Sequence, residues 1–139
     1  MLYYIRALNE HQSIMVQENK EQQVIHEGVL SLLEQLCLFH GATYEGRRDA
    51  AAKILHIVQK VPILVSEITR DMLFPTKAVK EADCIWINYR AVDEIVRTRG
   101  KTLLYFHDGT FLQLSIDPRS LKRSLSLCRQ FNDFLDMVR

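Results

Sequence analysis

Residues 92–116 have the sequence VDEIVRTRGKTLLYFHDGTFLQLSI, and this stretch decides the fold. Val92–Thr98 and Leu103–Phe106 are rich in β-prone residues and are separated by a glycine-containing turn. Asp108-Gly109 is a strong signal for a two-residue hairpin turn, and Phe111–Ile116 follows it as a third β-prone segment. The stretch therefore predicts a three-stranded antiparallel meander over about residues 92–116.

A long helix is predicted directly after the meander. Asp117 suits the N-cap position, and Pro118 suits the first helical position. Apolar residues then recur with the period of one helix face, at Leu121, Leu125, Cys128, Phe131, Leu135 and Val138. This pattern predicts a helix over about residues 118–138, whose apolar face must cover a sheet or a second copy of the protein.

The sequence before the meander predicts further strands and a second helix. Leu2–Leu8 is β-prone, and Ser13–Gln17 with Gln22–His26 is typical of a hairpin. Residues 28–40 change to a helical period and are followed by Gly41, a residue that often ends helices.

The middle of the chain gives weaker signals. We expect short strands at Ile63–Glu67, Met72–Phe74 and Cys84–Tyr89. Residues 49–57 favour either a short helix with Asp49 as its N-cap or a strand, and both remain open. All these elements together predict an α+β fold with mostly antiparallel sheet, in a single domain over residues 1–139.

Composition excludes several classes of protein. The chain is 47% hydrophobic and 25% charged, as in ordinary globular domains, and no apolar run is long enough for a membrane span. The first residues lack the pattern of a secretory signal, so we expect a cytoplasmic protein without a membrane partner. The three widely spaced cysteines (Cys37, Cys84 and Cys128) predict buried thiols, and we expect neither a metal nor a cofactor.

Charge is distributed unevenly along the chain. Residues 1–40 carry two basic and five acidic side chains, a net charge of −3, whereas residues 41–139 carry sixteen basic and twelve acidic ones, a net charge of +4. A basic half permits binding of a polyanion without requiring it.

The segment Gly41–Arg48, with the sequence GATYEGRR, is the first candidate for function. Two glycines bracket Tyr44, and Arg47 and Arg48 follow. We expect a loop here, because glycine permits tight turns, and an aromatic ring beside guanidinium groups can stack and hold phosphate.

Five short blocks resemble the ComK family of competence transcription factors, in order and in spacing. They are Gly41–Arg48, Pro62–Val65, Leu73–Thr76, Cys84–Ile87 and Phe106–Gly109. The resemblance implies a DNA-binding transcriptional activator that recognises paired A/T-rich boxes, largely from the minor groove, and acts as a homo-oligomer. It also implies that the partner is double-stranded DNA and that there is no small-molecule substrate.

A second and shorter likeness is to LytTR DNA-binding domains. Cys84–Ile95, the hairpin at Asp108-Gly109 and the final helix follow in the same order as in that family. Asn88-Tyr89-Arg90 takes the place of its DNA-contacting segment.

With these resemblances, the candidate DNA contacts are Tyr44, Arg47, Arg48, Lys53, Lys77, Asn88 and Arg90. The arginines suit a narrow A/T-rich minor groove, the lysines suit phosphate contacts, and an asparagine can contact a base edge. For each residue a structural role is the alternative: an ion pair, a solvated charge, a packed ring or a turn. If the basic members share one face, DNA binding is favoured, and if they scatter, a protein-interaction module is favoured instead.

The remaining interpretations concern the hairpin tip, catalysis and the alternative to DNA binding. Arg97, Arg99 and Lys101 lie at the expected hairpin tip, where a solubilising turn is a stronger explanation than a DNA contact. No catalytic or phosphate-binding motif is present, so we expect no enzyme. The alternative to DNA binding is a protein-interaction module that acts as a partner or titrating regulator.

Overall fold

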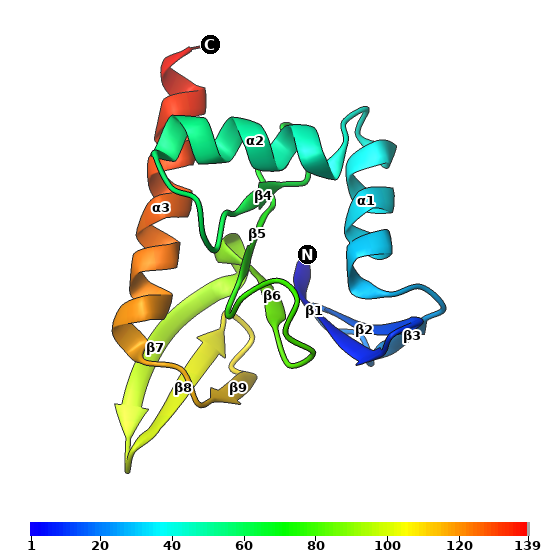
Figure 1. The fold of residues 1–139 in the computed structure, drawn as a ribbon. Helices are drawn as coiled ribbons and strands as arrows, with labels where there is room; N and C mark the ends of the chain where they lie inside the picture. The colour runs from blue at the N-terminus through cyan, green and yellow to red at the C-terminus, as the bar shows by residue number, and fades with distance from the viewer. Residues whose placement is uncertain (139) are drawn as a thin grey trace.

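The computed structural model describes residues 1–138 and has a mixed α+β fold (Figure 1). In chain order its elements are β1 (Leu2–Asn9), β2 (Gln12–Gln17), β3 (Gln23–Ile25), α1 (Val29–Phe39), α2 (Tyr44–Leu55), β4 (Ile63–Leu64), β5 (Met72–Pro75), β6 (Ile85–Asn88), the single 3-10 turn η1 (Tyr89–Ala91), β7 (Val92–Thr98), β8 (Lys101–Phe106), β9 (Phe111–Leu114) and α3 (Pro118–Met137). The predicted α+β class, the internal helix and the C-terminal helix are confirmed.

The strands form two antiparallel sheets. The larger has the order β3-β2-β1-β6-β5-β4, and the smaller is the predicted meander, β7-β8-β9. Strand β1 lies between β2 and β6, so Tyr4 stands opposite Val16 on one side and Ile87 on the other. The predicted strand at Ile63–Glu67 is shorter than expected, because only Ile63 and Leu64 pair with β5.

Both faces of the six-stranded sheet are covered. Alternate residues of a strand point to opposite faces, and successive residues of β5 and β6 accordingly enter different apolar clusters. Leu73 and Trp86 pack in the cluster that includes residues of α1. Phe74 and Ile87 pack in the cluster that includes the meander, α2 and α3.

The two sheets are joined through aromatic contacts at the start of β1. Tyr3 and Tyr4 both stack on Phe106 of β8, with ring centroids 4.6 and 5.7 Å apart. Two consecutive residues can face the same partner because the pairing of β1 with β2 is irregular between Leu2 and Tyr4.

Helix α3 begins as its sequence predicts. The Asp117 carboxylate accepts a hydrogen bond of 2.8 Å from the backbone N–H of Arg119, and Pro118 occupies the first turn. The apolar stripe is buried in the chain's own core at Leu121, Leu125, Cys128 and Phe131. The stripe therefore covers the protein's own sheets over most of its length.

The three cysteines are free and buried, as expected, and burial raises the pKa of all three thiols. Within residues 1–138, no group of three or more His, Cys, Asp or Glu side chains is arranged to hold a metal ion. No helix in the same range is long and apolar enough to cross a membrane.

Candidate nucleic-acid interface

Only residues 41–43 of the segment Gly41–Arg48 form a loop, and the sequence-based expectation is wrong for Tyr44–Arg48, which belong to α2. Gly41 does adopt a positive φ of 77°, but α2 begins at Tyr44 with Thr43 as its N-cap. The Thr43 hydroxyl oxygen accepts a 3.0 Å hydrogen bond from the backbone N–H of Gly46. A Cβ at Gly46 would lie 3.0 Å from that oxygen, so the second glycine leaves room for the cap. Residues 49–55 continue this helix, and Asp49 is not its N-cap.

We predict that Thr43→Ala lowers the free energy of unfolding by about 0.5–2 kcal/mol, because the cap of α2 is lost. The measurement is urea denaturation followed by circular dichroism. Thr43→Ser keeps the hydroxyl and should stay close to the wild type. Equal midpoints for Thr43→Ala and the wild type would show that this hydroxyl does not hold the start of α2.

Arg47 and Arg90 converge on the turn at residues 66–71, between β4 and β5. Arg47 forms a 3.4 Å ion pair with Glu67, and its side chain is 18% exposed. Arg90 donates to the backbone oxygen of Thr69 and forms a 3.3 Å ion pair with Asp71. Both guanidinium groups therefore already have partners within the protein.

A third arginine ties the same turn to the end of α3. Arg70 donates to the side-chain and backbone oxygens of Asn132, at 2.8 and 3.2 Å. It also forms a 3.0 Å ion pair with Asp136. The turn at residues 66–71 is thus held by arginines from three parts of the chain.

Two other candidates on α2 also have internal contacts. Arg48 donates to the backbone oxygen of Val58 at 3.1 Å. The ring of Tyr44 packs edge-on against Trp86, with centroids 6.3 Å apart, and burial raises the pKa of its hydroxyl. Lys53, in the last turn of α2, is exposed and forms no ion pair among the described residues.

Lys77 and Asn88 lie elsewhere. Lys77 pairs with Asp83 after the end of β5, whereas Arg90 reaches Asp71 before its start. Asn88 is fully buried, and its amide donates to the backbone oxygen of Leu2 and to Asp71, at 2.9 and 3.0 Å. The environment of Asn88 is that of a structural residue.

The predicted residues therefore do not form one basic face, and by the criterion of a shared face this set alone favours the protein-interaction alternative. The structure brings Arg47 and Arg90 to the same turn and separates Lys77 from them. The exposed positions of α2 also include Glu45 and Asp49, so this face is not a strong attractor for phosphate.

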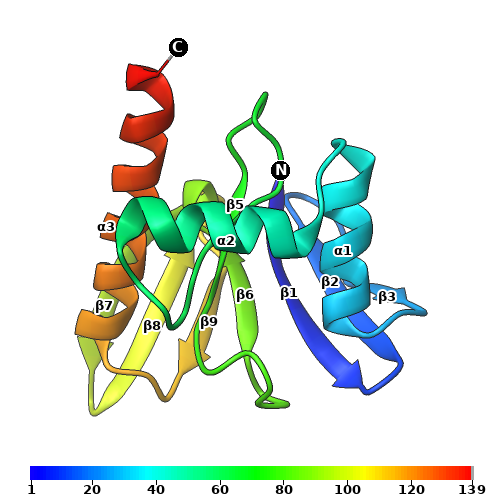
Figure 2. The same cartoon turned by 45° about the horizontal axis from the view of Figure 1, so that its top comes forward.

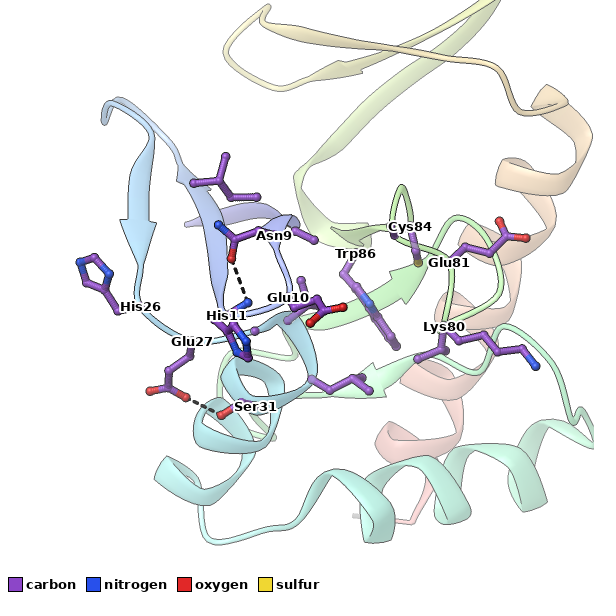
Figure 3. Close-up of a pocket in the computed structure, with 17 residues that line it drawn as sticks. Asn9, Glu10, His11, His26, Glu27, Ser31, Lys80, Glu81, Cys84 and Trp86 are labelled. Carbon is purple, nitrogen blue, oxygen red and sulfur yellow. Dashed lines mark hydrogen bonds between the residues drawn. The ribbon is translucent and has the colours of Figure 1, made fainter.

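A hollow of about 970 Å³ lies between the β1–β2 turn, the start of α1 and the β5–β6 connection (Figure 3). Trp86 forms part of its wall. Three glutamates (Glu10, Glu27 and Glu81) and one lysine (Lys80) line it. This excess of carboxylates does not suit a polyanion.

Six of the cations that form no ion pair among residues 1–138 gather in another place, on α3 and on the β7–β8 hairpin. They are Arg97, Arg99, Lys101, Lys122, Arg123 and Arg129, all exposed and none ion-paired among residues 1–138. The candidate DNA contacts chosen from the sequence did not include this group. The three hairpin residues were interpreted as a solubilising turn, and the basic residues of α3 were not considered. The signal was available, because the basic residues of α3 fall between the members of its apolar stripe.

Comparison with known proteins places the chain in a family. The model of the ComK protein family matches residues 3–137, from β1 to the end of α3. The chain belongs to the ComK family. The competence transcription factor of Bacillus subtilis (strain 168) is 30% identical to this ComK-family chain over 112 residues, which cover 77% of the chain and 58% of that relative. The chain thus spans 58% of the length of this relative. No solved structure matches it.

The blocks that carry the ComK resemblance are mostly core elements in the structure. Pro62–Val65 and Leu73–Thr76 are entirely buried, and Cys84, Trp86 and Ile87 are buried around β6. The blocks therefore reflect how this ComK-family chain folds, and not which of its surfaces contacts a partner. For this reason they do not by themselves identify the residues that bind a partner.

Proposed function

We propose that the protein is a DNA-binding transcriptional regulator that recognises A/T-rich duplex DNA. The observation that carries the proposal is the family match over nearly the whole described chain. The relative that the chain resembles is a competence transcription factor. The group of exposed, unpaired cations adds support, because positive charge facing solvent is the main source of affinity for a phosphate backbone.

Only part of the predicted contact set remains in this proposal. Lys53 stays as a phosphate contact, because it is exposed and forms no ion pair among the described residues. For Arg47, Arg48, Lys77 and Arg90, a contact with DNA would have to replace a partner inside the protein. Tyr44 and Asn88, with their packing and hydrogen bonds, are assigned structural roles.

Fluorescence anisotropy with two labelled duplexes of equal length, one A/T-rich and one G/C-rich, tests the proposed function. We expect the A/T-rich duplex to bind more tightly by roughly 1–3 kcal/mol, because a narrow A/T minor groove has an enhanced negative potential. Equal affinities for the two duplexes would support DNA binding but refute the preference for A/T-rich DNA. Absence of binding to either duplex would refute the function and favour a protein-interaction module.

The proposal includes self-association through the end of α3. Phe134, Met137 and Val138 are exposed there, whereas Leu125 and Phe131 belong to the chain's own core. Exposed apolar side chains at one site are typical of surfaces that meet another protein. A second copy of the chain is the partner that we propose for this end of the helix.

We predict that Phe134→Ser with Met137→Ser converts an oligomer to a monomer without unfolding it, because both side chains face solvent in the single chain. Sedimentation velocity at several protein concentrations measures the change. Leu38→Ser with Phe39→Ser, at the exposed end of α1, is the matched control and should leave association unchanged. A wild-type protein that sediments as a monomer at all concentrations would contradict the prediction.

A further inference from the structure

Unpaired positive charge is concentrated on two neighbouring elements, the tip of the β7–β8 hairpin and the solvent face of α3. We call Arg97, Arg99, Lys122, Arg123 and Arg129 the hairpin–helix surface. All five side chains are exposed, and none forms an ion pair with a residue in the range 1–138. Their charges are therefore free to act on an external anion.

Strand register places the hairpin arginines beside the start of α3. Arg97 stands opposite Thr102 in the β7–β8 ladder. The Thr102 hydroxyl donates a 2.6 Å hydrogen bond to the backbone oxygen of Ile116, which directly precedes the N-cap Asp117. Since directly opposed residues share one face of a sheet, Arg97 lies on the face from which α3 departs. Figures 1 and 2 both show the hairpin extending past the first turn of this helix.

Electrostatics at the N-cap agree with this placement. The pKa of the Asp117 carboxyl lies below its usual range, first because of the Arg119 backbone N–H, then because of the Arg119 side chain, with Arg97 acting in the same direction. Arg119 itself is paired with Asp117 at 3.2 Å, so we leave it out of the surface.

The helix contributes its cations on the side away from the core. Lys122 and Arg129 are seven residues apart, which puts them on one face about 10 Å apart along the axis. One DNA strand carries a phosphate about every 3.4 Å of axial rise, so this length spans roughly three phosphates. Arg123 is also exposed and points about 100° further round the helix than Lys122, so it extends the positive charge to the adjoining side of α3.

The carboxylates near the hairpin–helix surface that form no ion pair among residues 1–138 are fewer than its five cations and leave it with a net positive charge. Asp117, which also interacts with Arg97, is paired with Arg119 at 3.2 Å. Asp136 is engaged by Arg70 at the far end of α3. Asp93 and Glu94 lie at the start of β7, three or more residues from Arg97, which is about 10 Å or more along a strand. Asp133 follows Arg129 by one helical turn and is the nearest exposed carboxylate on the α3 stripe.

We propose that the hairpin–helix surface is where the protein contacts the DNA backbone. This inference rests on the proposed function and assigns its phosphate contacts to residues other than Arg47 and Arg48. Under this proposal the hairpin tip contacts phosphates, in addition to any role as a solubilising turn. Arg99 and Gly100, both with positive φ, form the tight turn that brings Arg97 and Arg99 to the end of the hairpin.

The test compares three double variants that each remove two positive charges. They are Lys122→Ser with Arg123→Ser, Arg97→Ser with Arg99→Ser, and the control Lys20→Ser with Lys80→Ser, whose lysines are exposed, unpaired among residues 1–138 and outside the surface. Anisotropy with the A/T-rich duplex is measured over a series of salt concentrations. Thermal denaturation checks that every variant is folded.

We expect each surface variant to weaken binding on the order of tenfold or more. Each should also lower the slope of log affinity against log salt by about two, since each lost phosphate contact removes about one. The control should keep the slope of the wild type. If the wild type binds and both surface variants match the control, the surface assignment is refuted and the proposed function stands. If the wild type binds neither an A/T-rich nor a G/C-rich duplex, both proposals fail.

Discussion

Trp86→Ala should lower the free energy of unfolding by about 3–5 kcal/mol, the range for removing a large aromatic side chain from a core. Trp86 is only 1% exposed and lies in the cluster that joins the six-stranded sheet to α1. Its ring also supports Tyr44 at the start of α2. Truncation would therefore open a cavity at the point where β6, α1 and α2 meet.

Chemical denaturation followed by far-ultraviolet circular dichroism measures this loss, because Trp86 is the single tryptophan and its fluorescence is absent from the variant. Trp86→Phe refills part of the cavity and should lose less. An unfolding midpoint of Trp86→Ala within error of the wild type would mean that β6 is not a core strand as described.

Asn88→Ala should give the second largest loss of stability. The side chain is fully buried and links β1, the turn before β5 and η1, through Leu2, Asp71 and the backbone N–H of Arg90. Each buried polar group that loses its partner costs about 1–3 kcal/mol, so we expect a total loss of about 3 kcal/mol. Urea denaturation measures it.

The same variant separates the two interpretations of Asn88. Gln113→Ala, which removes an exposed amide from β9, is the matched control and should be nearly neutral. If Asn88→Ala keeps its stability but loses affinity for duplex DNA, Asn88 contacts DNA, which is one of the two roles that its sequence context left open. A loss of stability supports the buried, structural role.

The parts of the fold with local signals were predictable from sequence. Asp108-Gly109 fixes a hairpin turn, and Asp117-Pro118 fixes a helix start, because both act through the backbone of their immediate neighbours. The start of helix α2 was missed because Gly46 was interpreted as a loop residue, whereas a helix over residues 49–57 was one of the two alternatives left open. The place of Gly46 inside a helix depends on the cap from Thr43, and the first turn is further held by the packing of Tyr44 on Trp86, a residue distant in sequence.

The candidate site was harder to predict because ion pairs connect distant residues. Arg47 forms an ion pair with Glu67, and Arg70 forms one with Asp136. Neither ion pair can be predicted from the neighbouring sequence. An arginine in a motif that suggests DNA binding can therefore already be paired within the protein. The free cations of α3 had a local signal, but it is visible only when the solvent side of the helix is considered together with its apolar stripe.

The salt dependence of duplex affinity in the wild-type protein tests the central claim most directly. A surface that binds through phosphate contacts releases counterions, so log affinity should fall linearly with log salt at about 0.9 per contact. For the hairpin–helix surface with Lys53 we predict a slope between about −3 and −6. Affinity that does not change with salt, or no binding at the lowest salt concentration, would contradict the account.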